Sequence, residues 1–456
     1  MSHDRTRAGF KDRTRVADAR ERLLAAVTPH GRTETLPLTE ADGRAVADTT
    51  VSPTPVPGYD RAAMDGWAVR AEDTFGASDR SPTVLFAEDD EVGPDGAVRV
   101  HTGSELPPGA DAVVMIEQAE RVPRSRSRAE GSRDDETQSV SNHGTAGSSG
   151  EPTDPRDEVG RDVEVFDAVA EGENVGPTGE DVAEGQTLYE PPHRLRPSDL
   201  GLLKSVGMTE VEVAERPRVS VIPTGEELVD ADPEPGEVIE TNGLTISRLT
   251  ERWGADATYR DIVTDDEDAL REAVERDLDH DAVVTTGGSS VGERDLIPEV
   301  VEELGEVLVH GVALKPGHPV ALGLVEGTPV VMLPGYPVAC IVNAVQFLRP
   351  VIRELGRLPH DPHPTRRATL ARKVSSEPGV RTFARVRLSA PEDGTDPGDG
   401  DDAGDAPATE ATPTRASGSG MLSSVALADG WVVVPESREG LDAGEAVDVR
   451  LWEVAE

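Results

Sequence analysis

The sequence predicts a multidomain protein of the α/β plus β class, with a central three-layer α/β domain over 217–358 and a small β-barrel over 364–456. Two patterns support this prediction. Apolar strand-like runs alternate with helical segments between 217 and 356, which is typical of a mostly parallel sheet covered on both faces. After 364 the runs become short and alternating, as in a small barrel or sandwich.

Each expected strand of the α/β domain is followed by a helix. The expected strand and helix pairs are 218–223 with 241–254, 257–263 with 268–278, 282–286 with 296–305, and 329–335 with 338–356. Ligands of such sheets bind at the carboxyl ends of the strands. The residues that follow each strand are therefore the first candidates for a site.

The N-terminal half has a different sequence pattern from the α/β domain. A short amphipathic helix is expected over 16–27, followed by short strands and turns rich in Pro and Gly up to about residue 120. The stretches 121–158 and 391–417 contain almost no large apolar side chains. We expect both to be flexible surface insertions, because they cannot bury enough apolar area to become ordered.

Composition excludes several classes of function. The 456 residues include 45 basic and 88 acidic side chains, a net charge of −43, so a nucleic-acid or anionic membrane partner is not expected. Lys is rare, which together with the acidity is typical of proteins from halophiles that accumulate salt. The single cysteine, Cys340, excludes an intrachain disulfide. With no apolar stretch long enough to cross a bilayer, we expect a soluble cytoplasmic protein.

The segment 285–295, TTGGSSVGERD, carries the strongest local signal. Gly287 and Gly288 allow a sharp turn and a close approach to a ligand, and Ser289 and Ser290 add hydroxyl groups. The following helix presents free backbone N–H groups to an anion. A phosphate cradle with the carboxylate of Asp295 at its rim is one interpretation. The other is a plain strand–turn–helix corner in which Asp295 serves as a cap.

Three carboxylates are expected at this edge of the sheet: Glu227, Asp265 and Asp295. Gathered around a phosphate they would repel one another, and Mg²⁺ would resolve that repulsion. Each also has a local alternative. Glu227 could be an acid in a helical first turn, and Asp265 could cap the helix that begins near 268, a role for which Asp266 competes.

Lys315, in LKPGHP, is one of four lysines in a chain that otherwise uses Arg. A compact ammonium group suits an oxyanion in a tight space, although a solvated loop lysine is the alternative. His310 and His318 flank this loop without ligand spacing and are not expected to bind metal. Asp65 lies in AAMDGWAVR, and its local sequence indicates no more than a residue in a turn.

At this point the motifs resemble a known family, the molybdopterin molybdenumtransferases or MoeA proteins. The motifs in family order are TGEEL (224–228), TTGGSSVGERD (285–295), LKPGHP (314–319) and LPGYPV (333–338), with upstream AAMDGWAVR (62–70), VHTGSELPPGADAVV (100–114) and GEDVAEGQ (179–186), and downstream RTFARVRL (381–388) and SGMLSSVALADG (419–430). Nearly the whole chain is covered except for the two expected insertions.

The resemblance implies an elongated homodimer of four-domain subunits. A discontinuous first domain would comprise 1–55 and 170–216, and a β-rich second domain would comprise 56–169. The third domain, 217–358, would have the molybdopterin-binding fold, and 364–456 would be the fourth. The family's active cleft lies between the third domain of one subunit and the second domain of the other, which would bring Asp65 to the substrate across the dimer interface.

The resemblance also implies the chemistry. Adenylylated molybdopterin and molybdate would be substrates of a Mg²⁺-dependent step that releases AMP and inserts the metal. Asp65, Asp265, Asp295 and Lys315 would be catalytic, and Glu227, Asp265 and Asp295 would hold Mg²⁺. The substrate would contact Thr102, Asp181, Thr224, Gly225, Gly287, Gly288, Ser289, Ser290, Gly292, Pro334, Gly335, Pro337, Arg381 and Ser419, of which Arg381 and Ser419 would join Lys315 as molybdate donors.

This chain departs from the family pattern at three places. Gly311 and His318 stand where further lysines are common, and Tyr336 replaces a common Asn in the Pro-Gly-Asn-Pro turn. Fewer cations leave open whether molybdate or tungstate is preferred. Transient contacts with a molybdopterin adenylyltransferase and with acceptor apo-enzymes are expected.

Two other functions remain alternatives at this point. A molybdopterin adenylyltransferase shares the third-domain fold, but those enzymes lack the flanking domains. A non-catalytic scaffold similar to gephyrin would not need the acids at the strand ends.

Overall fold

The computed structural model describes residues 13–123, 161–287, 296–390, 409–414 and 420–453. The chain divides into two compact units. Unit 1 comprises 1–49, 189–200 and 210–456, and unit 2 comprises 50–188 and 201–209.

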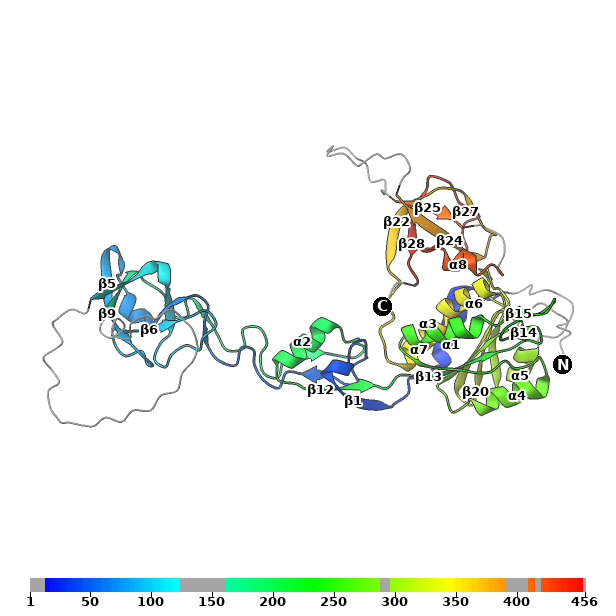
Figure 1. Ribbon diagram of the computed structural model, residues 1–456, viewed down its shortest axis with the longest axis horizontal. Helices are drawn as coiled ribbons and strands as arrows, with labels where there is room; N and C mark the ends of the chain where they lie inside the picture. The colour runs from blue at the N-terminus through cyan, green and yellow to red at the C-terminus, as the bar shows by residue number, and fades with distance from the viewer. Residues whose placement is uncertain (1–12, 124–160, 288–295, 391–408, 415–419, 454–456) are drawn as a thin grey trace. The chain divides into compact units, whose positions relative to one another are not determined.

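A six-stranded sheet forms the centre of unit 1 (Figure 1). Its strand order is β16-β13-β17-β21-β20-β18. Its strands are β13 (Arg218–Pro223), β16 (Asp256–Tyr259), β17 (Ala282–Thr286), β18 (Glu306–His310), β20 (Ala321–Val325) and β21 (Thr328–Leu333). The first four in sheet order are parallel, as predicted, whereas β20 is antiparallel to both of its neighbours. The sequence pattern did not reveal β18 and β20.

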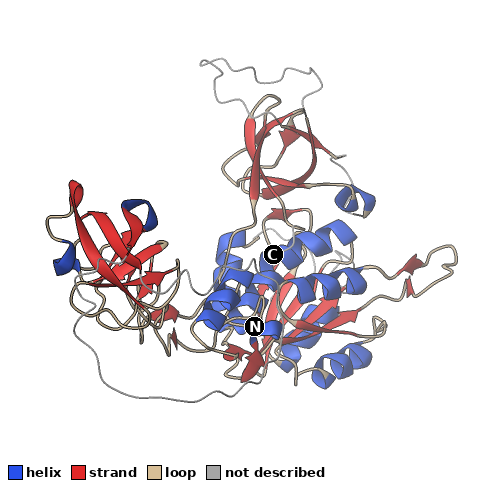
Figure 2. Ribbon diagram, turned by 60° about the vertical axis from the view of Figure 1, so that its left-hand side comes forward, coloured by secondary structure: helices blue, strands red, loops and turns tan. Residues whose placement is uncertain are grey.

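Helices cover both faces of this sheet, so the predicted three-layer α/β domain is confirmed (Figure 2). One face carries α1 (Val16–Ala26), α3 (Asn242–Arg252), α6 (Pro337–Asn343), a π-helical segment (Ala344–Leu348) and α7 (Arg349–Leu355). The other carries α4 (Glu267–Arg276) and α5 (Leu296–Leu304). Side chains along β17 point alternately to the two faces of the sheet. Buried Val284 packs in the hydrophobic core on the α1 and α3 side, and buried Val283 packs in the core on the α4 and α5 side.

Five strands near the C-terminus close into a barrel, which confirms that prediction. The ring runs through β24 (Arg381–Ser389), β25 (Glu410–Pro413), β22 (Thr365–Leu370), β28 (Ala446–Arg450) and β26 (Gly430–Val434), which pairs with β24 again. Smaller elements are β19 (Leu314–Lys315), β23 (Val374–Ser375), β27 (Gly440–Leu441) and α8 (Ser423–Ala426). Inward residues such as Leu370, Val386 and Val434 fill its core.

Unit 1 also contains short two-stranded sheets. They join β1 (Thr33–Pro37) to β12 (Glu210–Ala214), and β14 (Leu228–Val229) to β15 (Val238–Ile239). A 3-10 turn lies at Leu38–Glu40. The helix α2 (Pro197–Ser205) has its residues 197–200 assigned to unit 1 and its residues 201–205 assigned to unit 2.

Unit 2 is built around a second six-stranded sheet, β7-β4-β6-β5-β9-β8. Its strands are β4 (Gly66–Val69), β5 (Ser78–Glu88), β6 (Gly96–Val100), β7 (Ala112–Met115), β8 (Ala119–Pro123) and β9 (Arg161–Asp167). Short pairs join β2 (Thr50–Val51) to β11 (Thr187–Tyr189) and β3 (Arg61–Ala62) to β10 (Val175–Gly176), and 3-10 turns lie at Ala71–Thr74 and Ile116–Gln118. Regular structure thus extends into the ends of both expected insertions, at 121–123 and 410–413. Apart from residues 409 and 414, the rest of those insertions is outside the described residues.

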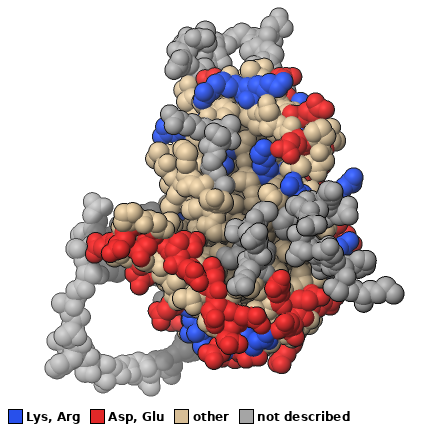
Figure 3. Space-filling view, turned by 90° about the vertical axis from the view of Figure 1, so that its right-hand side faces the viewer, with Lys and Arg blue, Asp and Glu red and all other residues tan. Residues whose placement is uncertain are grey.

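Charge is unevenly spread over unit 1. Acidic side chains crowd the lower half of the face shown in Figure 3, and basic ones gather along its upper part. The helices α4 and α5 contribute the exposed acids Glu267, Asp268, Glu272, Glu275, Glu299, Glu302 and Glu303. Within the described ranges, no helix has both the length and the apolar character needed to span a bilayer.

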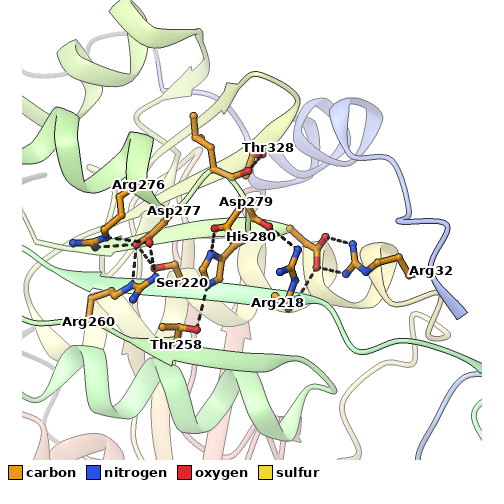
Figure 4. A network of polar contacts seen from close by, with 12 residues as sticks. Arg32, Arg218, Ser220, Thr258, Arg260, Arg276, Asp277, Asp279, His280 and Thr328 are labelled. Atoms are coloured by element: carbon orange, nitrogen blue, oxygen red, sulfur yellow. Dashed lines mark hydrogen bonds and ion pairs between the residues drawn. The ribbon is translucent and has the colours of Figure 1, made fainter. Parts of the chain in front are cut away.

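A network of ion pairs fastens the amino half of the sheet (Figure 4). The carboxylate of Asp277 is fully buried and accepts hydrogen bonds from the Ser220 hydroxyl at 2.6 Å, from Arg260 at 2.5 Å and from Arg276 at 2.9 Å. Burial alone would raise the pKa of Asp277, but these donors offset it and lower the pKa to about 2. Every charge here has a partner, which marks this half as structural.

Candidate functional site

Three neighbouring strands of unit 1 end at the same level. Pro223 of β13 pairs with Thr286 of β17, which pairs with Leu333 of β21. After β13 the chain crosses to β16 on one side, and then returns to β17 on the other. The carboxyl ends of β13 and β17 are therefore the topological switch point, where open α/β sheets bind ligands.

The turns after these strands approach one another closely. A Cβ atom on Gly287 would lie 1.9 Å from the Thr224 carbonyl oxygen, and the φ of Gly287 is +151°. Only glycine fits there without moving the backbone. On the other side, a Cβ on Gly335 would lie 3.6 Å from Gly287 Cα, an ordinary contact. The predicted ligand residues Thr224, Gly225, Gly287 and Gly335 thus come together, with buried Pro334 and half-buried Pro337 flanking Gly335.

Buried hydroxyl groups line this edge. Thr224, Thr285 and Thr286 are each at most 1% exposed, and their hydroxyl oxygens have no hydrogen-bond partner among the described residues. An unsatisfied buried hydroxyl costs about 1–3 kcal/mol. Two of them, Thr285 and Thr286, belong to the segment 285–295, but its sequence pattern predicts no role for their hydroxyls. At the end of β17, these hydroxyls are candidate donors for a ligand.

Two of the three expected carboxylates lie on adjacent turns. Thr224 forms a parallel bridge with Val263, and the Gly225 amide donates to the Val263 carbonyl at 3.1 Å, so the turns carrying Glu227 and Asp265 run side by side. The cap of α4 is Asp266, whose carboxylate accepts from the Ala269 amide at 3.0 Å. The competing cap role of Asp265 is thereby removed.

No three His, Cys, Asp or Glu side chains cluster for a metal in the part of the chain that the structure describes. The third expected carboxylate, Asp295, is outside that part, as are the predicted residues Gly288, Ser289, Ser290, Gly292 and Ser419. The expected Mg²⁺ site remains a prediction.

Sequence reasoning missed a further acid at this edge. Glu240 is 8% exposed and accepts hydrogen bonds from the Gly243 amide at 2.6 Å and from the Tyr259 hydroxyl. Burial and then Glu240 raise the pKa of Tyr259. Next to it, the Asn242 side chain donates to the Gly335 carbonyl at 2.7 Å. Glu240 and Asn242 therefore fasten the start of α3 to β16 and to the Gly335 turn. An acid just before a helix start was the available signal.

The two basic residues that are predicted to bind molybdate lie on adjacent strands. Leu314 of β19 pairs with Arg381 of β24 and Lys315 pairs with Thr382, so Lys315 and Arg381 are one residue apart in register, with their side chains on opposite faces of the strand pair. Each cation is held by an acid, Lys315 Nζ by Glu377 at 3.1 Å and Arg381 Nε by Glu436 at 3.1 Å. A recess of about 340 Å³ beside Arg381 is lined by Arg15, Ala17, Asp18, Gly379, Glu436 and Ser437.

The departures from the family pattern give no further cation in this region. Gly311 is buried with a φ of +87°, which favours glycine there. Burial, and then the charge of Arg13, lower the pKa of half-buried His318, which favours its neutral form.

In unit 2 the structure brings together Asp65 and Thr102. The Asp65 carboxylate accepts from the Thr102 amide at 2.7 Å and from its hydroxyl at 2.9 Å. These two hydrogen bonds lower the pKa of Asp65, so it is ionised at neutral pH. Asp181 is exposed on a separate turn and joins neither residue, its amide donating to Val56.

Three family models match this chain in succession. They are the MoeA N-terminal region (domain I and II) at 14–207, a "probable molybdopterin binding domain" at 220–354, and the MoeA C-terminal region (domain IV) at 367–452. Among curated proteins, the molybdopterin molybdenumtransferase of Bacillus subtilis is 30% identical over 95% of this chain and 93% of its own length. A second, molybdopterin molybdenumtransferase 2 of Mycobacterium tuberculosis, is 31% identical over 82% of this chain and 88% of its own.

Solved structures agree with these matches. The molybdopterin biosynthesis MoeA protein of Pyrococcus horikoshii superposes with a TM-score of 0.74 at 32% identity, covering 97% of this chain and 100% of that one.

Proposed function

The chain belongs to the MoeA family, and on that premise we propose that it is an enzyme of molybdenum cofactor biosynthesis that inserts molybdate into adenylylated molybdopterin and releases AMP. The observation that carries this proposal is the carboxyl edge of β13, β17 and β21. Gly287 approaches the Thr224 backbone closely there, and buried threonine hydroxyls without partners among the described residues lie at this switch point. Such an edge suits the phosphate groups of the substrate.

The residues at this edge fit a bound Mg²⁺ ion. The orphaned Thr224 hydroxyl lies beside the turns of Glu227 and Asp265, and hard oxygen donors of this kind are what Mg²⁺ prefers. With Asp295 they would hold Mg²⁺, which would neutralise charge on the two linked phosphates. The threonine hydroxyls would donate to phosphate oxygens and orient the bond that is cleaved.

Molybdate would bind near Lys315 and Arg381. Both cations carry one acidic partner, so a dianion would have to share or displace Glu377 and Glu436. Ser419 completes this proposed set. Because the cations are already partly neutralised, we expect weak molybdate binding and leave tungstate as a competing substrate.

The rest of the proposal concerns assembly. We propose a cytoplasmic homodimer in which Asp65 and Thr102, with Asp181, serve the site of the other subunit. The exposure of the Asp65–Thr102 pair supports this, since no described residue of unit 2 covers it. Transient contacts with a molybdopterin adenylyltransferase and with acceptor apo-enzymes belong to the same proposal.

Reconstitution with purified adenylylated molybdopterin tests the proposed function. The parent protein should release AMP only with Mg²⁺ and an oxyanion, compared for molybdate and tungstate over a KCl series. Asp265→Asn should lower this release on the order of 100-fold, because one charged donor at the phosphates is lost. Full AMP release by Asp265→Asn would contradict the assignment of that carboxylate. No release by the parent with either oxyanion would contradict the function.

A further inference from the structure

Tyr336 belongs to the turn that borders the candidate site. It follows Gly335, whose turn contacts Gly287 at the end of β17. The turn is held from both sides. The Asn242 side chain donates to the Gly335 carbonyl at 2.7 Å, and the Cys340 amide donates to the Tyr336 carbonyl at 2.8 Å. The backbone that carries the Tyr336 ring is therefore held in place next to the end of β17.

The fold itself makes little use of this ring. Tyr336 is 62% exposed, although the residues that follow it in α6 are buried. Among the described residues its hydroxyl forms no hydrogen bond, and its ring edge meets the backbone at Gly420, where a Cβ would lie 3.4 Å from Cδ1 and 3.7 Å from Cε1. An aromatic ring of this size usually buries most of its area. Here most of it is left open next to a site.

The proposed substrate offers a matching surface. Adenylylated molybdopterin carries a flat heteroaromatic ring on each side of its phosphates, one in adenine and one in the pterin. Phosphates anchored at Thr224 and Gly287 would place one of these rings near the Gly335 turn. Flat heterocycles stack on exposed aromatic side chains without needing hydrogen bonds.

We propose that Tyr336 is a substrate-binding residue whose ring stacks on a flat heterocycle attached to the phosphates bound at the β13–β17 edge. This inference rests on the proposed function. Stacking on Tyr336 would contribute to substrate affinity without depending on charge. That matters in a protein with a net charge of −43, whose acidic surface repels an anionic substrate.

The test compares Tyr336→Leu with Tyr336→Phe. Leu retains bulk but loses the aromatic face, whereas Phe retains it. The binding of AMP, of adenylylated molybdopterin and of inorganic pyrophosphate should be measured by calorimetry, with Mg²⁺. We expect Tyr336→Leu to weaken a heterocyclic ligand on the order of tenfold, Tyr336→Phe to bind like the parent, and pyrophosphate affinity to be unchanged in both.

The arms distinguish the two heterocycles. Weaker AMP binding by Tyr336→Leu assigns the stack to adenine. Weaker binding of adenylylated molybdopterin with unchanged AMP binding assigns it to the pterin. Raising KCl should weaken pyrophosphate binding but leave the ratio between parent and Tyr336→Leu constant, since stacking is not screened by salt. Phe75→Leu, which removes an exposed aromatic ring in unit 2, serves as the matched control and should change none of these affinities.

Equal affinity of Tyr336→Leu and the parent for both heterocyclic ligands would overturn the proposal. So would a loss of pyrophosphate affinity equal to the loss for the heterocycles, because it would mean that Leu distorts the turn. If pyrophosphate fails to bind the parent, the phosphate site of the proposed function has failed. If pyrophosphate binds and only the stacking effect is missing, the proposed function stands without Tyr336.

Discussion

The two ends of the central β13–β17 pair differ in how their polar groups are satisfied. At the amino end, Arg32 holds Asp281 through two hydrogen bonds of 2.9 and 2.6 Å, and the Arg218 amide donates to the same carboxylate at 2.7 Å. At the carboxyl end, the buried hydroxyls of Thr224 and Thr286 have no partner among the described residues. The comparison separates groups that stabilise the fold from groups held for a ligand.

The largest effect on stability is expected from removing an ion pair at the amino end, where the polar groups have partners. Asp277→Asn removes a buried charge that faces Arg260 and Arg276, so we expect a loss of about 3 kcal/mol in the free energy of unfolding. Urea unfolding followed by tryptophan emission measures it. The exposed Asp256→Asn, on the same sheet, is the control and should change stability by less than about 0.5 kcal/mol. A loss no larger than that of the control would contradict the structural role.

At the carboxyl end, adding a side chain to Gly287 should lower the rate of catalysis. The Cβ of Gly287→Ala would displace the Thr224 backbone, and a shift of that size should lower turnover on the order of 100-fold. Gly335→Ala meets only an ordinary contact and provides the matched control. Steady-state AMP release measures both variants. Equal activities of the two variants would mean that the close approach of the strand ends is not needed.

The pH dependence of stability sharpens the comparison. The pKa of Asp277 is about 2 in the folded state and about 3.8 when unfolded. A lowered pKa stabilises the fold above the unfolded value, and this contribution is lost as the pH falls through the folded value. The gap in unfolding free energy between parent and Asp277→Asn should therefore shrink by about 2 kcal/mol between pH 5 and pH 2. A gap that stays constant over this range would show that Asp277 has no lowered pKa.

Removing single hydroxyl groups should give the smallest changes in stability, and these changes should differ between the two ends of the strands. Ser220→Ala deletes a donor to Asp277 and should cost about 1 kcal/mol of stability. Thr286→Val deletes a hydroxyl without a partner and should leave stability unchanged or raise it by up to about 1 kcal/mol, while weakening pyrophosphate binding. Thermal unfolding and calorimetry read out the two quantities. Destabilisation by Thr286→Val would show that its hydroxyl serves the fold.

Much of the site edge could be predicted because strand ends follow from local patterns. Apolar runs ending in Pro223, Thr286 and Leu333 were sufficient to place the turns after them together, and the three residues do pair in one row. The antiparallel pair of β18 and β20 was missed. In β18, four of the five residues are exposed or only partly buried, so its pattern does not stand out.

Other features depend on partners that are distant in sequence. Glu240 meets Tyr259 from another strand, and Lys315 meets Glu377 from the barrel. No local pattern predicts such pairs. The choice between Asp265 and Asp266 as the cap of α4 was also open locally, and the hydrogen bond to Ala269 settled it.

The most direct test of the two-ended account compares Asp265→Asn with Asp277→Asn in one experiment that measures AMP release at 25 °C and the midpoint of thermal unfolding. The account predicts that Asp265→Asn loses most of its AMP release with little change in midpoint, and that Asp277→Asn unfolds at lower temperature yet releases AMP at nearly the parent rate. The reverse pattern, or an equal loss of both quantities in both variants, would contradict it.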